Sequence, residues 1–120
     1  KVSFTVVKNI ANMADYLEAA DLAILTGGTV MFESAACGTP AVVTCAYEHQ
    51  LPQARWFHDQ GIAETMGFFP ESVDQDLVVS AATKLAESPG RRQRMSEAGK
   101  TAIDGRGLSR IVGIIQSQLC

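Results

Sequence analysis

One run of the sequence constrains the fold more than any other: Asp21-Leu-Ala-Ile-Leu-Thr-Gly-Gly-Thr-Val-Met-Phe-Glu33. A short apolar run, typical of a buried strand, leads into Gly27-Gly28, and a helical pattern begins directly afterwards. Glycines permit a tight turn and close approach of a ligand to the backbone. A helix N-terminus offers unpaired N–H groups and a partial positive charge. The run therefore indicates a phosphate or pyrophosphate site at the carboxyl end of a strand, with an ordinary tight turn as the alternative.

Apolar runs alternate with helical patterns along the rest of the chain. Strands are predicted at Val2–Val7, Leu22–Leu25, Ala41–Cys45 and Ile62–Met66. Helices are predicted at 12–20, 30–37, 50–60, from the capping box Ser72-Val-Asp-Gln75, from Ser88-Pro89, and at 108–119. Strand–helix units about twenty residues apart indicate right-handed crossovers and a parallel sheet. We expect an α/β fold: a doubly wound, Rossmann-like parallel sheet of about four strands flanked by helices.

Several helices have a predicted buried face or a predicted boundary. Asn12 is a candidate N-cap, with Met13, Leu17 and Ala20 behind it on one face. The helix after the capping box has the inner stripe Leu77, Val78, Ala81, Ala82 and Leu85, and the last helix has the face Leu108, Ile111, Val112, Ile115 and Leu119. Asp104-Gly-Arg-Gly107 follows a helix rather than a strand, so we interpret it as a helix break that positions the last helix.

Composition excludes several classes of function. The chain has 120 residues, a net charge of −3 and a pI near 5.3, which argues against nucleic acid or an anionic membrane surface as partner. No apolar stretch reaches the ~18 residues of a membrane span. The three cysteines show no CxxC pair and no metal-ligand spacing, so we expect a reducing, cytoplasmic setting and no metal. Because the chain opens at Lys1 rather than Met, we expect it to be cut from something longer.

Glu33 strengthens the interpretation of the glycine run. It lies about one turn into the predicted helix, on the side that returns toward the glycines. A carboxylate there can accept hydrogen bonds from both vicinal hydroxyls of a ribose while the turn holds the phosphates. The alternative is an acid that simply favours a helix N-terminus.

At this point the chain resembles a known family. The resemblance is carried by these segments: Asn9-Ile10-Ala11-Asn12-Met13, Ala20-Asp21-Leu22, Gly27-Gly28-Thr29, Glu33, Gly38-Thr39-Pro40, His49-Gln50, Met95-Ser-Glu-Ala-Gly99, Asp104-Gly-Arg-Gly107 and Arg110. They resemble the C-terminal half of glycosyltransferase-B-type enzymes. The likeness is greatest to the UDP-sugar hydrolase of pseudaminic acid biosynthesis and the related spore-coat polysaccharide biosynthesis protein G. It is more distant to the N-acetylglucosaminyltransferase that makes lipid II.

The resemblance implies a role for each matching residue. Ile10 would lie against uracil, Gly27, Gly28 and Thr29 would cradle the pyrophosphate, and Glu33 would hold the ribose hydroxyls. Gln50 would reach the sugar or its phosphate, and His49 would line the cleft. The family's proposed catalytic histidine belongs to an N-terminal domain absent from these residues. The resemblance therefore implies that residues 1–120 form a C-terminal UDP-sugar-binding domain with no catalytic residue and no cofactor of its own.

Three functions stay open. The first is a UDP-sugar hydrolase of surface-polysaccharide or nonulosonic-acid biosynthesis, and the second is a glycosyltransferase with the same donor site. The third is a non-catalytic binding fragment that needs a partner domain. Compared with the lipid II enzyme, the loop before Glu33 is one residue shorter and Ala11-Asn12 replaces an acidic pair, which weakens the transferase assignment more than the nucleotide one.

The resemblance also raises a problem for the sheet. The family places further strands, absent here, between the Val2–Val7 strand and the Leu22–Leu25 strand. Unpaired strand edges need a partner, so either these two strands pair directly or a second chain supplies the pairing in a homodimer. We expect the direct pairing, which gives a compact four-stranded sheet.

Overall fold

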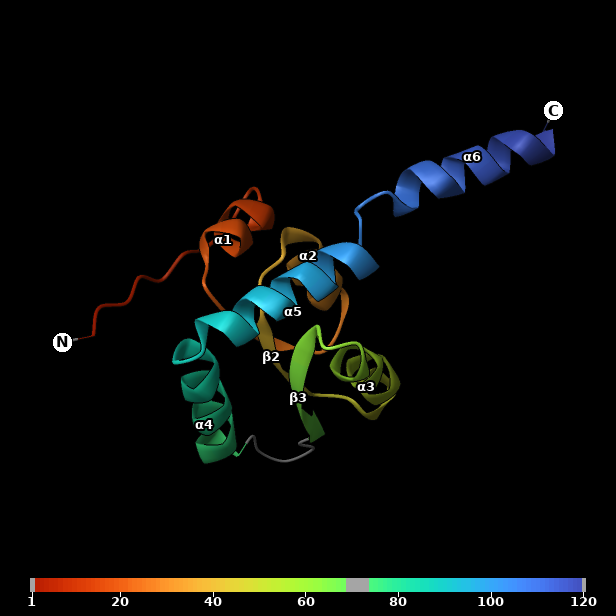
Figure 1. Cartoon of the computed structure of the whole chain (residues 1–120). Helices are drawn as coiled ribbons and strands as arrows, with labels where there is room; N and C mark the ends of the chain where they lie inside the picture. Colours follow the sequence, from red (N-terminus) through yellow and green to blue (C-terminus); the bar gives the residue numbers. More distant parts are fainter. Residues whose placement is uncertain (1, 69–73, 120) are drawn as a thin grey trace.

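The computed structural model describes residues 2–68 and 74–119 and shows strands alternating with helices (Figure 1). The elements, in chain order, are α1 (Met13–Ala19), β1 (Ala23–Thr26), α2 (Thr29–Cys37), β2 (Ala41–Cys45), the 3₁₀ turn η1 (Glu48–Gln50), α3 (Leu51–Asp59), β3 (Ala63–Phe68), α4 (Gln75–Ala86), α5 (Pro89–Ala102) and α6 (Gly107–Leu119).

The strands form one parallel sheet in the order β1-β2-β3. Ala23 on β1 pairs with Ala41 on β2, which pairs with Ala63 on β3, so the amino ends of all three strands share one edge. The central strand β2 is buried at every position. An all-apolar or nearly apolar strand buried on both faces is typical of a parallel sheet covered by helices, as predicted.

Helices cover both faces of this sheet. Alternate residues of β2 point to opposite sides, so Val43 packs with Met31 of α2 and Phe57 of α3, whereas Val42 packs with Leu85 of α4. The predicted α/β, doubly wound architecture is confirmed, with three strands in the described residues rather than four.

The segment Val2–Val7 does not form the predicted strand. It runs in an extended course away from the body of the molecule (Figure 1), and Val2 and Phe4 are 91% and 87% exposed. The predicted pairing of this segment with β1 is therefore wrong for this structure. Alternating β-branched residues favour an extended backbone, but a strand also needs a neighbour for its hydrogen bonds, and here the chain leaves its own sheet.

The predicted start of α1 and the predicted end of α2 are confirmed, whereas most of the predicted buried face of α1 is not. Asn12 caps α1, because its side chain accepts a hydrogen bond from the Ala14 N–H at 3.2 Å. Of the predicted stripe only Leu17 is buried, while Met13 and Ala20 are exposed. Helix α2 ends as predicted at Gly38, whose φ of 72° is left-handed.

Helix α4 begins later than the predicted capping box. Its N-cap is Asp74, whose carboxylate accepts hydrogen bonds from the N–H groups of Asp76 and Leu77 at 3.1 and 3.2 Å. Ser72, the predicted cap, lies outside the described residues. Leu77 is 52% exposed, so the predicted buried stripe of this helix is wrong at this position.

Helix α6 begins after the predicted break and projects from the body (Figure 1). Gly105 has a φ of 74°, and Arg110 forms an ion pair with Asp104 across the break. Hydrogen bonds from Arg110 lower the pKa of Asp104 to about 2. The predicted apolar face exists, but all of its residues are exposed, so α6 buries none of them.

Candidate functional site

The glycine turn stands where β1 meets α2, at the carboxyl edge of the sheet. Gly27 is buried, and its N–H donates to the Thr44 carbonyl at 2.8 Å, which holds the turn beside the end of β2. Gly28 is the N-cap of α2 with a φ of 135°, a conformation that favours glycine. Thr29, the first residue of α2, is exposed. The Met31 N–H donates to the Gly28 carbonyl at 3.2 Å, and no side chain caps the helix, so the N–H groups of Thr29 and Val30 have no side-chain acceptor. A helix start of this kind can bind an anion.

Gln50 connects this turn to the next loop. Its Oε1 accepts hydrogen bonds from the N–H groups of Ala46 and Tyr47 at 3.0 and 3.2 Å, and its Nε2 donates to the Gly27 carbonyl at 2.6 Å. Gln50 belongs to η1, so the predicted helix from Gln50 starts one residue later, at Leu51. The turns after β1 and β2 are thus joined by one side chain.

Tyr47 and His49 stand on the loop that Gln50 holds. Their rings are stacked, with centroids 5.7 Å apart and planes 17° from parallel. Both residues are exposed. Sequence reasoning selected His49 but missed Tyr47, which carries no motif of its own. Its position two residues after β2, at the carboxyl edge, was the available signal.

The other predicted site residues lie on the neighbouring elements. Glu33 is exposed on α2, one turn beyond the glycine turn, as the helical spacing predicts. Ile10 is half-buried on the segment before α1, directly after Asn9, whose φ of 54° is the one positive value of a described non-glycine residue. The structure therefore brings Gly27, Gly28 and Gln50 into direct proximity and places Ile10 on a different segment.

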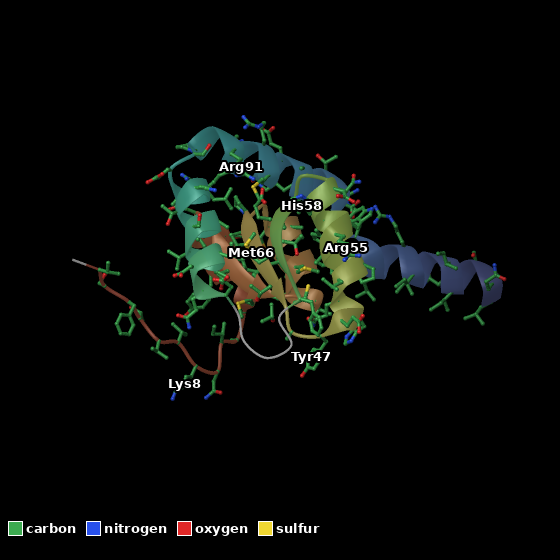
Figure 2. The ribbon with its side chains drawn as sticks, turned by 90° about the horizontal axis from the view of Figure 1, so that it is seen from below. Lys8, Tyr47, Arg55, His58, Met66 and Arg91 are labelled. Atoms are coloured by element: carbon green, nitrogen blue, oxygen red, sulfur yellow. The ribbon has the colours of Figure 1, made fainter. Side chains whose placement is uncertain are left out.

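His58 belongs to a separate cluster. Its Nδ1 lies 3.8 Å from a carboxylate oxygen of Glu64, which also pairs with Arg91. These residues line a cavity of about 410 Å³ near the start of β3. Figure 2 shows His58 and Arg91 toward one end of the body and Tyr47 toward the other. This cluster is thus remote from the glycine turn and bridges α3, β3 and α5.

The two described cysteines, Cys37 and Cys45, are not candidates for nucleophilic chemistry. Cys37 and Cys45 are free thiols, and burial raises the pKa of both. A raised pKa leaves little thiolate at neutral pH, and thiolate is the reactive form. Across residues 2–68 and 74–119, no three His, Cys, Asp or Glu side chains gather in a way that could hold a metal ion.

The fold defines a Rossmann-like domain in which a glycine turn and the start of α2 lie at the carboxyl edge of the parallel sheet. The chain belongs to the glycosyltransferase family 28 C-terminal domain family, whose model matches residues 2–108. The resemblance drawn from the sequence is thereby confirmed.

Two curated relatives extend this finding. The chain is 29% identical over 116 residues to the spore coat polysaccharide biosynthesis protein SpsG of Bacillus subtilis, covering 97% of this chain and 34% of that protein. It is 32% identical over 118 residues to the UDP-N-acetylglucosamine–N-acetylmuramyl-(pentapeptide) pyrophosphoryl-undecaprenol N-acetylglucosamine transferase of Carboxydothermus hydrogenoformans, covering 94% of this chain and 31% of that protein. The chain thus spans about a third of the length of these relatives. No solved structure matches it.

None of the helices in the described residues combines the length and the apolar character that crossing a membrane requires.

Proposed function

We propose that this domain binds the nucleotide part of a UDP-sugar at the carboxyl edge of its sheet. The observation that carries the proposal is the glycine turn, in which Gly28 leaves the first N–H groups of α2 open to a pyrophosphate. Thr29 adds to this pyrophosphate site, and Glu33, one turn further along α2, accepts hydrogen bonds from the ribose hydroxyls. Ile10 packs against the uracil. The name of the transferase relative includes UDP-N-acetylglucosamine, which supports the same ligand class here.

The reaction that we propose is hydrolysis of the UDP-sugar in surface-polysaccharide or nonulosonic-acid biosynthesis. The relative concerned with spore coat polysaccharide supports the pathway class. The second candidate is sugar transfer to an acceptor other than water, and the 32% identity to a transferase favours it. In both cases His49 and Gln50 stand on the loop beside the glycine turn, where the sugar would extend from the pyrophosphate.

Catalysis in this proposal needs a second domain. The described residues offer a binding turn but no reactive thiol and no histidine paired to a carboxylate at that edge, since the His58–Glu64 contact lies elsewhere. We propose that an N-terminal domain supplies the catalytic group, that the chain alone is a binding unit, and that it works in the cytoplasm. The alternative partner is a second copy of this chain, which would form a homodimer through the open edge of β1.

Titration calorimetry of the full-length protein with UDP and with ADP tests the ligand. We expect UDP to bind more tightly, because the pyrophosphate turn is common to both ligands whereas the base contact distinguishes them. Equal affinities would remove the uridine assignment, and no binding of either would remove the proposed site.

Turnover provides the second test. Release of free sugar from a UDP-sugar is measured for residues 1–120 and for the full-length protein, with and without candidate acceptors. We expect release by the full-length protein only. Turnover by residues 1–120 at a similar rate would refute the need for a second domain, and activity that depends on an added acceptor would favour transfer over hydrolysis.

A further inference from the structure

We propose that Gln50 is a positioning residue that locks the glycine turn to the loop after β2 and so sets the geometry of the phosphate site. This inference rests on the proposed nucleotide function but assigns Gln50 a different task from contact with the sugar.

The side-chain amide of Gln50 is already engaged by the protein backbone on both of its atoms. Oε1 accepts from two consecutive N–H groups, those of Ala46 and Tyr47, and Nε2 donates to the Gly27 carbonyl. Gln50 and Gly27 are 23 residues apart in the chain. The contact is thus tertiary, and it ties together the two segments that leave β1 and β2 at the carboxyl edge.

The packing around Gly27 matches this task. A Cβ built on Gly27 would lie 2.9 Å from the Gln50 Cβ and 3.0 Å from its Oε1, closer than such atoms approach without a shift. At Gly28 a Cβ would lie 3.7 Å from Nε2, which is ordinary contact, although its φ of 135° still favours glycine. Gly27 is therefore required for close approach to Gln50, and Gly28 for the backbone conformation.

A change in the contact between Gln50 and the Gly27 carbonyl would shift the start of α2, where the phosphate is proposed to bind. Gly27 directly precedes Gly28, the N-cap of α2, so the Gly27 carbonyl fixes the peptide plane that leads into the helix. On the other side, the two hydrogen bonds that Oε1 accepts fix the start of the loop that carries the stacked Tyr47 and His49. One amide thus fixes the position of the glycine turn relative to this loop, and preorganised binding groups bind without an ordering cost.

Positioning and direct sugar contact differ in a measurable way. If Gln50 holds the turn, its loss lowers the affinity for UDP and for UDP-N-acetylglucosamine by the same factor, because both ligands place a pyrophosphate on the turn. If Gln50 binds the sugar, only the UDP-sugar loses affinity. Gln50→Ala removes all three bonds, whereas Gln50→Glu keeps an acceptor for Ala46 and Tyr47 but places an oxygen against the Gly27 carbonyl.

The experiment is titration of the full-length wild type, Gln50→Ala, Gln50→Glu and the control Gln53→Ala with both ligands. Gln53 is an exposed glutamine on α3 and is expected to change neither affinity. We expect Gln50→Ala to lose about tenfold or more for both ligands, equal within about twofold. Gln50→Glu should lose at least as much for both ligands, because its carboxylate repels the Gly27 carbonyl and the pyrophosphate. A loss confined to UDP-N-acetylglucosamine, or no loss, would overturn the proposal.

Amide hydrogen exchange supplies a readout that needs no ligand. In Gln50→Ala the N–H groups of Ala46 and Tyr47 should exchange faster, while Gln50→Glu should restore their protection and the β2 amides should not change. Unchanged exchange at Ala46 and Tyr47 would overturn the proposed positioning role of Gln50, even if the protein bound no nucleotide. Failure of the wild type to bind UDP would instead refute the proposed function alone.

Discussion

Single residues at the carboxyl edge differ in how much their neighbours constrain them. Gly27 packs so closely against Gln50 that no side chain fits there, whereas Glu33 and His49 are exposed and accessible to a ligand. Substitution at these exposed positions should thus change ligand binding with little effect on folding, because an exposed side chain away from special backbone contributes little stability.

Replacement of Glu33 by alanine should weaken UDP binding by about 1.5–3 kcal/mol, the scale of a lost hydrogen bond to a charged group. Calorimetry on the full-length protein measures the change. The matched control is Glu87→Ala, which removes an exposed carboxylate at the C-terminal end of α4. If Glu33→Ala and Glu87→Ala bind UDP alike, Glu33 serves only as an acid near a helix N-terminus.

Replacement of His49 by alanine should lower turnover only modestly, because this proposal assigns the acid–base chemistry to another domain. Steady-state rates of sugar release by the full-length protein provide the measurement, with His58→Ala as the control at the other end of the sheet. A loss beyond about a hundredfold, the scale of general acid–base catalysis, would identify His49 as a catalytic residue.

Among the contacts between helices, Gly99 of α5 packs directly against the backbone of α2 at Ala35. A Cβ on Gly99 would lie 2.9 Å from the Ala35 carbonyl oxygen and 3.2 Å from its Cα. Backbone atoms cannot rotate away as a side chain can, so the two helices would have to separate. Gly99 is thus a packing residue, although it lies mid-helix where glycine is otherwise unfavourable.

We therefore expect Gly99→Ala to lower the free energy of unfolding by about 1–3 kcal/mol, the usual cost of overpacking. Gly113→Ala is the matched control, because a Cβ at this α6 position meets nothing within 4 Å. There alanine should instead favour the helix by up to ~1 kcal/mol. Urea denaturation followed by circular dichroism distinguishes the two, and equal midpoints for both variants would contradict the packing argument.

The molecule as a whole leaves several apolar surfaces uncovered. They are the extended segment Val2–Val7, the free edge of β1 with Ile24 at 56% exposure, and the apolar face of α6. Figure 1 shows the first and last of these projecting from the compact body. Open sheet edges and apolar patches of this kind associate with other surfaces, so the proposed partner domain would cover them.

Residues 1–120 alone should therefore self-associate as concentration rises, and this association is the homodimer alternative named above. Sedimentation velocity over a wide concentration range measures it. Deleting residues 1–7 and substituting Ile111→Lys on α6 should each reduce the association, whereas Lys84→Ala on the exposed side of α4 should not. A chain that stays monomeric at every concentration would contradict the prediction.

Features that depend on local chemistry could be predicted from the amino-acid sequence alone. Period-2 and period-3.6 apolar patterns predicted the alternation of strands and helices, Asn12 and Gly38 predicted helix ends, and Gly27-Gly28 predicted the turn at the carboxyl edge. Caps, positive φ and amphipathic periods arise within a few residues of the chain, so they are readable without the fold.

Which of the predicted surfaces are covered by another segment depends instead on the three-dimensional fold. Val2–Val7 has a strand pattern but pairs with no strand of the described residues, and Leu77 and the apolar face of α6 stay exposed despite their helical periodicity. The amide of Gln50 reaches Gly27 across 23 residues, a contact that no local pattern indicates. Hydrogen-bond pairing and burial depend on two segments meeting in space, and the periodicity of one segment does not determine what lies opposite it.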